Sequence, residues 1–334
     1  NAFSLSKNGF DHVIGNCNSA PAWLKTNGKH NDGGTLISGG ENEYSEFLIA
    51  FLQGMKSKYN IDVTAISPTN EPDFEVSYES MNTTPSELNS IIKNLDTRLN
   101  SASLNNIKIL SPENYRVYDA NNSNRSATNY INTMFADPIV KSAIDVVATH
   151  TYADPNHTTN WNALKTAASS KPVWVTESAN LKSEDISMLD AANYIKWMLR
   201  GFNEGGMTAY MMHLFYEEED DNGYSSLVVW KPNGEIILPK RYHTFKHFTN
   251  LIKKGYKKIV YCSSSIVYGN QGKNLYSENM PTYADDIYTT VKLQNEERVL
   301  RSGGIVARIS NVIGSGMSKN NVLSDILSQI PGKD

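Results

Sequence analysis

Two glutamates, Glu71 and Glu177, stand where apolar, strand-like runs of the sequence end. Glu71 follows the β-branched run 61–66 inside the stretch SPTNEPDF, and Glu177 ends the run 172–176. Short runs of this kind are typical of buried parallel strands, and α/β proteins place their chemistry at the carboxyl ends of such strands. Two carboxylates at that edge are the groups that hydrolysis of a glycosidic bond requires. One acts as a protonated acid and the other as an ionised nucleophile or base.

A third carboxylate, Glu113, has a similar setting. It follows the apolar run 107–110 in Ser111-Pro112-Glu113. Glu113 therefore competes with the other two glutamates for a catalytic role, but it lacks the asparagine that precedes Glu71.

Three stretches of sequence resemble one enzyme family: NSAPAWLKTNG at 18–28, ISPTNEPDFEVSYES at 66–80 and WVTES at 174–178. Together they resemble the xylanase-like branch of glycoside hydrolase family 30, over about residues 10–255. The resemblance implies a retaining endo-glycosidase of the (β/α)8 TIM-barrel type that acts on a β-linked plant polysaccharide, most readily xylan. It also implies that Glu71 is the acid/base and Glu177 the nucleophile, with the carboxyls about 5–5.5 Å apart and the higher pKa on Glu71.

The same resemblance implies a substrate cleft. Asn70 is expected to hold a sugar hydroxyl, and the lining residues would be Trp23, Tyr78, His150, Tyr152 and Tyr216. Two of these residues have an alternative interpretation. Trp23 is either a core residue or a stacking platform for a sugar ring, and His150 is either a hydrogen-bonded structural group or part of the cleft.

The hydrophobic pattern predicts the elements that hold these residues. Six barrel strands are expected, at 12–17, 61–67, 107–110, 145–151, 172–177 and 207–215, with helices at 41–59, from Pro85 onward, at 124–142, 160–169, 188–204 and 241–252. A hairpin is expected at 227–238. An eight-stranded barrel needs two more strand–helix units, and by the resemblance the missing units are the first two.

The C-terminal segment changes character. The runs 257–269 and 304–314, with Ser264, Tyr288 and Lys292, resemble the second half of an extended short-chain dehydrogenase/reductase of the nucleotide-sugar epimerase type. In that family the lysine lowers the pKa of the tyrosine. No glycine-rich turn that could cradle a dinucleotide precedes these residues, so no cofactor is expected. The sequence thus predicts a chimera, with a partial glycosidase barrel at 1–252 and a Rossmann-like fragment at 253–334.

The fold prediction follows from counting strands. We expect an α/β fold of the (β/α)8 type that lacks its first two units. In one arrangement the tail strands 258–262 and 304–310 close the barrel beside 207–215 and 12–17, with tail helices at about 284–301 and 321–330. In the alternative the tail forms a separate small lobe.

Composition sets limits on partners. The chain has 334 residues and a net charge of −4, which gives no reason to expect nucleic acid, and no apolar run suggests a membrane span. Cys17 and Cys262 are too few for a disulfide scaffold. We expect a secreted, monomeric, polysaccharide-binding protein without a metal site. Its first residue is Asn1 and no signal peptide is present, so we expect it to begin inside a longer protein.

Two other functions remain open at this stage. One is a nucleotide-sugar epimerase or dehydratase fragment that uses Tyr288. The other is a folded chimera that keeps both glutamates but is catalytically impaired.

Overall fold

The computed structural model describes residues 12–118, 125–152, 160–180, 186–219, 226–251, 260–269 and 277–309. The chain divides into two compact units, Asn1–Phe248 and Thr249–Asp334. Within the described ranges, no helix combines the length and the apolar character needed to cross a bilayer.

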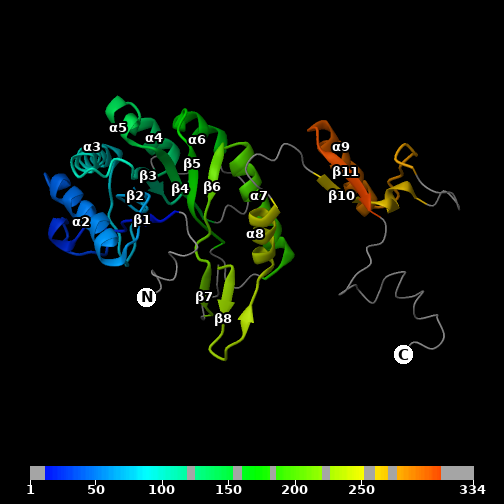
Figure 1. Cartoon of the computed structure of the whole chain (residues 1–334), viewed down its shortest axis with the longest axis horizontal. Helices are drawn as coiled ribbons and strands as arrows, with labels where there is room; N and C mark the ends of the chain where they lie inside the picture. Colours follow the sequence, from blue (N-terminus) through cyan, green and yellow to red (C-terminus); the bar gives the residue numbers. More distant parts are fainter. Residues whose placement is uncertain are drawn as a thin grey trace. The chain divides into compact units, whose positions relative to one another are not determined.

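Six parallel strands form the sheet of the first unit, and they lie side by side in chain order. They are β1 (Ile14–Asn16), β2 (Ala65–Ser67), β3 (Lys108–Asn114), β4 (Val146–Tyr152), β5 (Val173–Ala179) and β6 (Met207–Tyr210). Figure 1 shows them as a curled sheet, with helices along its outer side. The six predicted barrel strands and their order are therefore confirmed, and the first unit is a half-barrel of the TIM type.

Helices alternate with these strands. They are α2 (Glu41–Tyr59), α3 (Pro85–Ser101), α4 (Ala127–Met134), α5 (Pro138–Ala143), α6 (Trp161–Ala168), α7 (Met188–Asn203) and α8 (Lys240–Leu251), together with the short 3₁₀ turn η1 (Ala22–Leu24). The start of α3 was expected: Thr84 and Glu87 form a reciprocal capping box around Pro85. The single helix predicted over 124–142 is wrong. The Asp137 side chain accepts hydrogen bonds from the Ile139 and Val140 amides and so begins a new helix at Pro138.

Most of the apolar core lies between the sheet and its outer helices. The first cluster packs α2 and α3 against β2, with Leu48, Ile66 and Leu88 fully buried. The second cluster packs α4 and α6 against β5. The inner face of the sheet carries a smaller cluster of Ala65, Leu110, Val146 and Ala148, with Ile14 and Trp174 packed against it.

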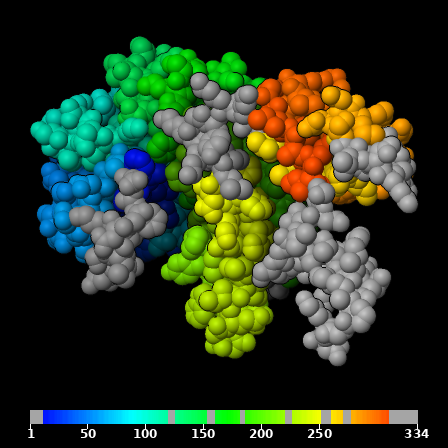
Figure 2. Space-filling view, turned by 45° about the vertical axis from the view of Figure 1, so that its right-hand side comes forward, coloured from blue at the N-terminus to red at the C-terminus, as the bar shows by residue number. Residues whose placement is uncertain are grey.

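A small three-stranded sheet follows the half-barrel in the sequence. It consists of β7 (Tyr216–Glu218), β8 (Val228–Trp230) and β9 (Ile236–Ile237), and β8 and β9 are antiparallel. The predicted hairpin at 227–238 is therefore confirmed. In Figures 1 and 2 this yellow-green segment projects from the rest of the first unit.

The described part of the second unit is a single strand–helix–strand motif. Its elements are β10 (Val260–Ser264), the 3₁₀ turn η2 (Ser265–Tyr268), α9 (Ile287–Arg301) and β11 (Ile305–Ile309). β10 and β11 pair with each other, in parallel, as a two-stranded sheet. The predicted closure of the barrel by these strands, beside β6 and β1, stays a prediction. In a strand–helix–strand unit, each strand forms its backbone hydrogen bonds with a partner that is near in the sequence. The loop that must be closed is then shorter, and its entropic cost lower, than for pairing with a distant strand. The predicted helix 321–330 and the predicted boundary at 252/253 lie outside the described residues.

Candidate active site

Glu71 lies in the loop that directly follows β2, with its backbone in the left-handed region (φ 44°). Its amide donates a hydrogen bond to the main-chain oxygen of Glu113 (2.9 Å), and the Tyr44 hydroxyl donates to the Pro68 oxygen (2.6 Å) in the same loop. A non-glycine residue held in this conformation costs about 1–3 kcal/mol and persists only where its surroundings fix it. The loop is thus anchored at both ends, and the Glu71 side chain is buried.

Glu177 lies within β5, opposite His150 of β4, at a register shift between the two strands. Its side chain is 21 % exposed, whereas that of Glu71 is 7 % exposed. The Tyr152 hydroxyl donates a hydrogen bond to Glu177 Oε2. One oxygen of the Glu177 carboxylate is therefore held by the protein.

The structure brings the two glutamates close together. One carboxylate oxygen of Glu71 lies within 4.8 Å of one of Glu177. Inverting glycosidases keep their carboxyls about 6.5–9.5 Å apart to admit a water molecule, and retaining ones keep them about 5–5.5 Å apart. The closest oxygens of the two glutamates therefore approach more nearly than the inverting range, which is compatible with the retaining class.

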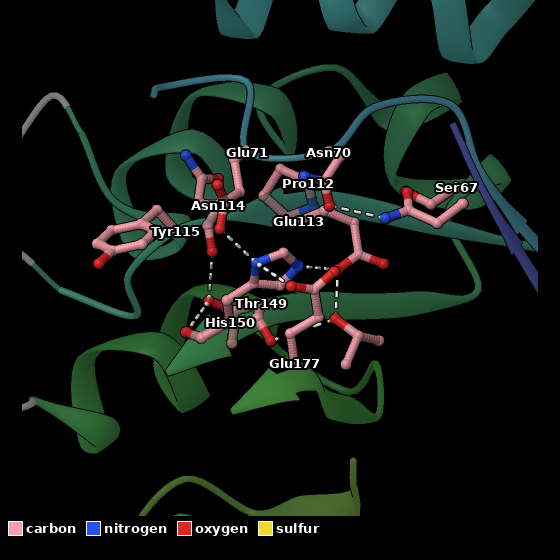
Figure 3. Close-up of polar contacts among 12 residues, drawn as sticks. Ser67, Asn70, Glu71, Pro112, Glu113, Asn114, Tyr115, Thr149, His150 and Glu177 are labelled. Carbon is pink, nitrogen blue, oxygen red and sulfur yellow. Dashed lines mark hydrogen bonds and ion pairs between the residues drawn. The ribbon is translucent and has the colours of Figure 1, made fainter. Parts of the chain in front are cut away.

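His150 lies between three carboxylates, as Figure 3 shows. Its Nδ1 lies 2.9 Å from Glu71 Oε1 and 3.5 Å from Glu177 Oε2, and its Nε2 lies 3.3 Å from Glu113 Oε2. The ring is fully buried. Burial alone would lower the pKa of His150, but its contacts with Glu113 and Glu71 and the charge of Glu177 outweigh this effect and raise the pKa to about 10. His150 is therefore both a hydrogen-bonded buried group and part of the site.

This raised pKa predicts how stability depends on pH. Because the pKa of His150 rises from 6.5 to about 10 on folding, the folded state binds this proton more tightly than the unfolded state. The stabilisation is complete below about pH 6.5 and is lost as the pH rises through about 10. Urea unfolding at a series of pH values, on the wild type and on His150→Asn, measures this. We expect a shallower decline in the variant, and equal declines in the two proteins would contradict the assignment.

Asn70 is positioned by a residue that the sequence did not single out. Asn16, at the end of β1, donates from Nδ2 to Asn70 Oδ1 (2.7 Å). This hydrogen bond fixes the orientation of the Asn70 amide, whose nitrogen is its donor group. A polar residue at the end of the first strand was the only signal that could have pointed to Asn16.

Aromatic rings stack beside the carboxylates. Tyr115 lies between Phe74 and Tyr152, with ring centroids 4.6 Å and 5.1 Å away. Tyr78 is 53 % exposed, and its pKa is raised, first by partial burial and then by the charges of Glu71 and Glu177. Tyr78 and Tyr152 therefore lie close enough to the two glutamates to interact electrostatically with their carboxylates. The sequence analysis missed Phe74 and Tyr115.

The two remaining predicted cleft residues are both exposed. Trp23, in η1, is 68 % exposed, so the alternative that it packs in the core is wrong. Tyr216 is 65 % exposed and begins β7. The last barrel strand was predicted to run over 207–215, directly before Tyr216, and this extent is wrong because β6 ends at Tyr210.

A buried ion pair supports the chain at the far end of β5. Arg241 of α8 lies 2.9 Å from Asp190 of α7, and both side chains are fully buried. Asp190 accepts a hydrogen bond from the side chain of Asn180, which directly follows β5 (2.7 Å). The two helices thus fix the chain just beyond Glu177.

The cluster Glu71, His150 and Glu177 offers three possible metal-ligand atoms within 4.8 Å of one another. A metal requires a neutral imidazole, because a protonated ring nitrogen cannot ligate. Here both ring nitrogens face carboxylates, which favours the protonated ring. We therefore assign the cluster to acid–base chemistry.

In the second unit, Lys292 and Tyr288 are neighbours on α9. The Lys292 ammonium lies 5.5 Å from the centre of the Tyr288 ring and donates to the Cys262 carbonyl oxygen (3.0 Å). Ser264 accepts a hydrogen bond from the Ile266 amide (3.3 Å) and so begins η2. The reductase-like origin of this unit, and hence the chimera, stays a prediction.

The first unit is similar to solved glycosidases. The catalytic domain of the family 30 xylanase C from Talaromyces cellulolyticus matches with a TM-score of 0.60 and 18 % identity, over 75 % of this chain and 58 % of that one. The family 30 subfamily 8 xylanase Xyn30A from Clostridium acetobutylicum matches with a TM-score of 0.58 and 22 % identity, over 75 % and 57 %. The endo-β1,6-glucanase BT3312 gives 0.62 and 19 %, over 72 % and 57 %. This chain spans little more than half the length of each.

These likenesses show a shared fold, and the family comes from a separate comparison. The family model described as "Glycosyl hydrolase family 59" matches residues 12–219, which is more than half of the chain. The predicted resemblance to family 30 is thus confirmed for the fold and for glycoside hydrolase membership, and the family model that matches is that of family 59. Both glutamates lie inside the matched range. The chain belongs to glycosyl hydrolase family 59.

Proposed function

We propose that this chain hydrolyses a β-linked glycan with retention of anomeric configuration, with Glu71 as acid/base and Glu177 as nucleophile. The observation that carries the proposal is the approach of their carboxylate oxygens to within 4.8 Å at the carboxyl edge of a half-barrel. Burial fits the roles, because Glu177 is the more exposed of the two and has an oxygen held by Tyr152.

The geometry indicates which oxygens react. Tyr152 donates to Oε2 of Glu177, and His150 also faces that oxygen, which leaves Oε1 to attack the anomeric carbon. His150 occupies Oε1 of Glu71, which leaves Oε2 to carry the proton. In the first step Glu177 Oε1 bonds to the anomeric carbon while the proton on Glu71 passes to the departing glycosidic oxygen. In the second step ionised Glu71 takes a proton from water, whose oxygen attacks the anomeric carbon and releases Glu177.

For the substrate we propose a polysaccharide, with xylan first. The support is limited to the fold relatives, of which two are named xylanases and one an endo-β1,6-glucanase. The exposed faces of Trp23 and Tyr78 suit stacking on the apolar face of a sugar ring. Secretion and a monomeric state stay predictions.

Product analysis by proton NMR tests the proposal. Purified protein is incubated with xylan and, separately, with β-1,6-glucan, and the first anomeric proton signal to appear is recorded before mutarotation. We expect the β-anomer, and no product with Glu177→Gln. An α-anomer from the wild type would overturn retention. Absence of hydrolysis on a panel of β-glycans would favour the catalytically impaired alternative.

Loss of the Asn16 side chain should weaken turnover without unfolding the protein. Asn16→Ala frees the Asn70 amide to rotate, so we expect kcat/KM to fall about 5- to 30-fold, the equivalent of one hydrogen bond of about 1–2 kcal/mol. The matched control is Asn162→Ala, at an exposed position of α6. Steady-state kinetics and thermal unfolding are measured for both. Equal kcat/KM in the two variants would show that Asn16 does not position Asn70.

A further inference from the structure

Glu113 has no step in the proposed chemistry, yet its setting is the most constrained of the three glutamates. Its backbone is left-handed (φ 62°), like that of Glu71 beside it, and its residue is 1 % exposed. Strained, buried, polar positions of this kind gather at functional sites. With a side chain only 2 % exposed, Glu113 does not reach substrate, so it does not compete with Glu71 or Glu177 for the chemistry.

The contacts of Glu113 connect the parts of the site. Its main-chain oxygen accepts the amide of Glu71 (2.9 Å). Its Oε2 accepts a hydrogen bond from Thr176, the residue just before the nucleophile, and lies 3.3 Å from His150 Nε2. Glu113 therefore meets the acid/base loop, the nucleophile strand and the histidine between them.

His150 has carboxylates on both of its nitrogens. Nε2 faces Glu113, while Nδ1 faces Glu71 and, at 3.5 Å, Glu177. A neutral imidazole has one N–H and one bare acceptor, and only the imidazolium donates from both nitrogens. With a carboxylate at Nε2, a neutral ring would keep its proton there and would turn a bare Nδ1 toward Glu71. That nitrogen could then hold the proton that Glu71 must deliver.

We propose that Glu113 is a positioning residue that keeps His150 protonated throughout turnover, so that Nδ1–H remains a donor to Glu71 and Glu177 at every step. The role in turnover rests on the proposed function, whereas the protonation of His150 does not. Glu113 and His150 then form a neutral pair. Glu71 and Glu177 share one negative charge before the first step, and Glu71 alone carries it once Glu177 is esterified. The net charge of the cluster is therefore the same on both sides of that step.

Nitrogen NMR on histidine-labelled protein tests the protonation directly and needs no substrate. The signals of His150 are assigned by their loss in His150→Asn. The titratable groups that face the ring are Glu71 beyond β2, Glu113 on β3, Glu177 on β5 and, edge-on, Tyr152 on β4. In the wild type we expect imidazolium shifts from about pH 5 to about pH 8, well above the ordinary His pKa of about 6.5. Wild-type His150 that is neutral at pH 8 would overturn the proposal.

Glu113→Gln isolates the charge, because glutamine keeps the shape and an acceptor oxygen. We expect the pH midpoint of the His150 titration to fall by at least about one pH unit in Glu113→Gln. The fall should be smaller in Glu113→Asp, which keeps the charge but places it one methylene farther from the ring. The matched control Glu43→Gln, at an exposed position of α2, should leave the midpoint unchanged. If Glu113→Gln does not fold, Glu113→Asp and the wild type still decide. A midpoint unchanged by both Glu113 variants would overturn the proposal.

The pH dependence of kcat/KM tests the role in turnover. In Glu113→Gln we expect an additional ionisation, absent from the wild type, at the midpoint that NMR gives for His150. A pH profile parallel to that of the wild type would overturn the positioning role. If the wild type hydrolyses no glycan, the proposed function fails on its own, and the NMR midpoints still decide whether Glu113 holds the proton on His150.

Discussion

Glu177→Gln is expected to lower kcat/KM for a β-glycan by at least about 10³-fold, the equivalent of about 4 kcal/mol in the activation barrier. The amide cannot form the covalent glycosyl ester, while it keeps the size of the side chain and can still accept a hydrogen bond from Tyr152. Steady-state kinetics measure the loss, and circular dichroism verifies the fold. Glu43→Gln, exposed on α2, serves as the matched control and should retain full activity.

The roles of the two glutamates can be separated by a small nucleophile. In Glu177→Ala the deleted carboxylate leaves room for azide at the anomeric carbon, so added azide should restore turnover of an activated aryl glycoside and give the α-glycosyl azide. Restoration with the β-glycosyl azide would place the deleted group on the acid/base side and would reverse our assignment.

Glu71→Gln should produce a loss that depends on the leaving group. A general acid contributes about 10²–10⁴-fold when the departing oxygen needs a proton, and little when it does not. We therefore expect a loss of at least about 10²-fold on an oligosaccharide and less than about tenfold for glycosylation by a dinitrophenyl glycoside. Pre-steady-state bursts with the aryl substrate measure glycosylation separately. An equal loss on both substrates would show that Glu71 does not protonate the leaving group.

The strands of the half-barrel could be predicted because each is a short apolar run that ends at a turn. The residues at which strands and helices begin and end were harder to predict. β3 continues through Pro112 and Glu113, where proline indicated an end, because the strand tolerates proline at an irregular point of its pairing with β4. The break between α4 and α5 was present in the sequence as Asp137-Pro138, a capping residue followed by proline, but the helical periodicity of the surrounding residues concealed it.

The two glutamates of the site could be predicted because each follows a predicted strand, but the group between them could not be predicted in detail. His150 contacts Glu71, in the loop after β2, and Glu113, on β3, and no local pattern encodes distances between side chains so far apart in the sequence. Asn16 was missed for the same reason, since its function depends on Asn70 in the loop after the next strand. The two tail strands were predicted in place, and they pair with each other, which the strand count alone did not indicate.

The most direct test of the central claim is to trap the covalent intermediate. The protein is incubated with a 2-deoxy-2-fluoro-β-glycoside bearing a good leaving group, with the xyloside and the glucoside tried in parallel, and is then digested and sequenced by mass spectrometry. The account predicts a single glycosyl adduct on the peptide that contains Glu177, absent in Glu177→Gln. An adduct on Glu71 or Glu113, or steady hydrolysis of the reagent without any adduct, would contradict it.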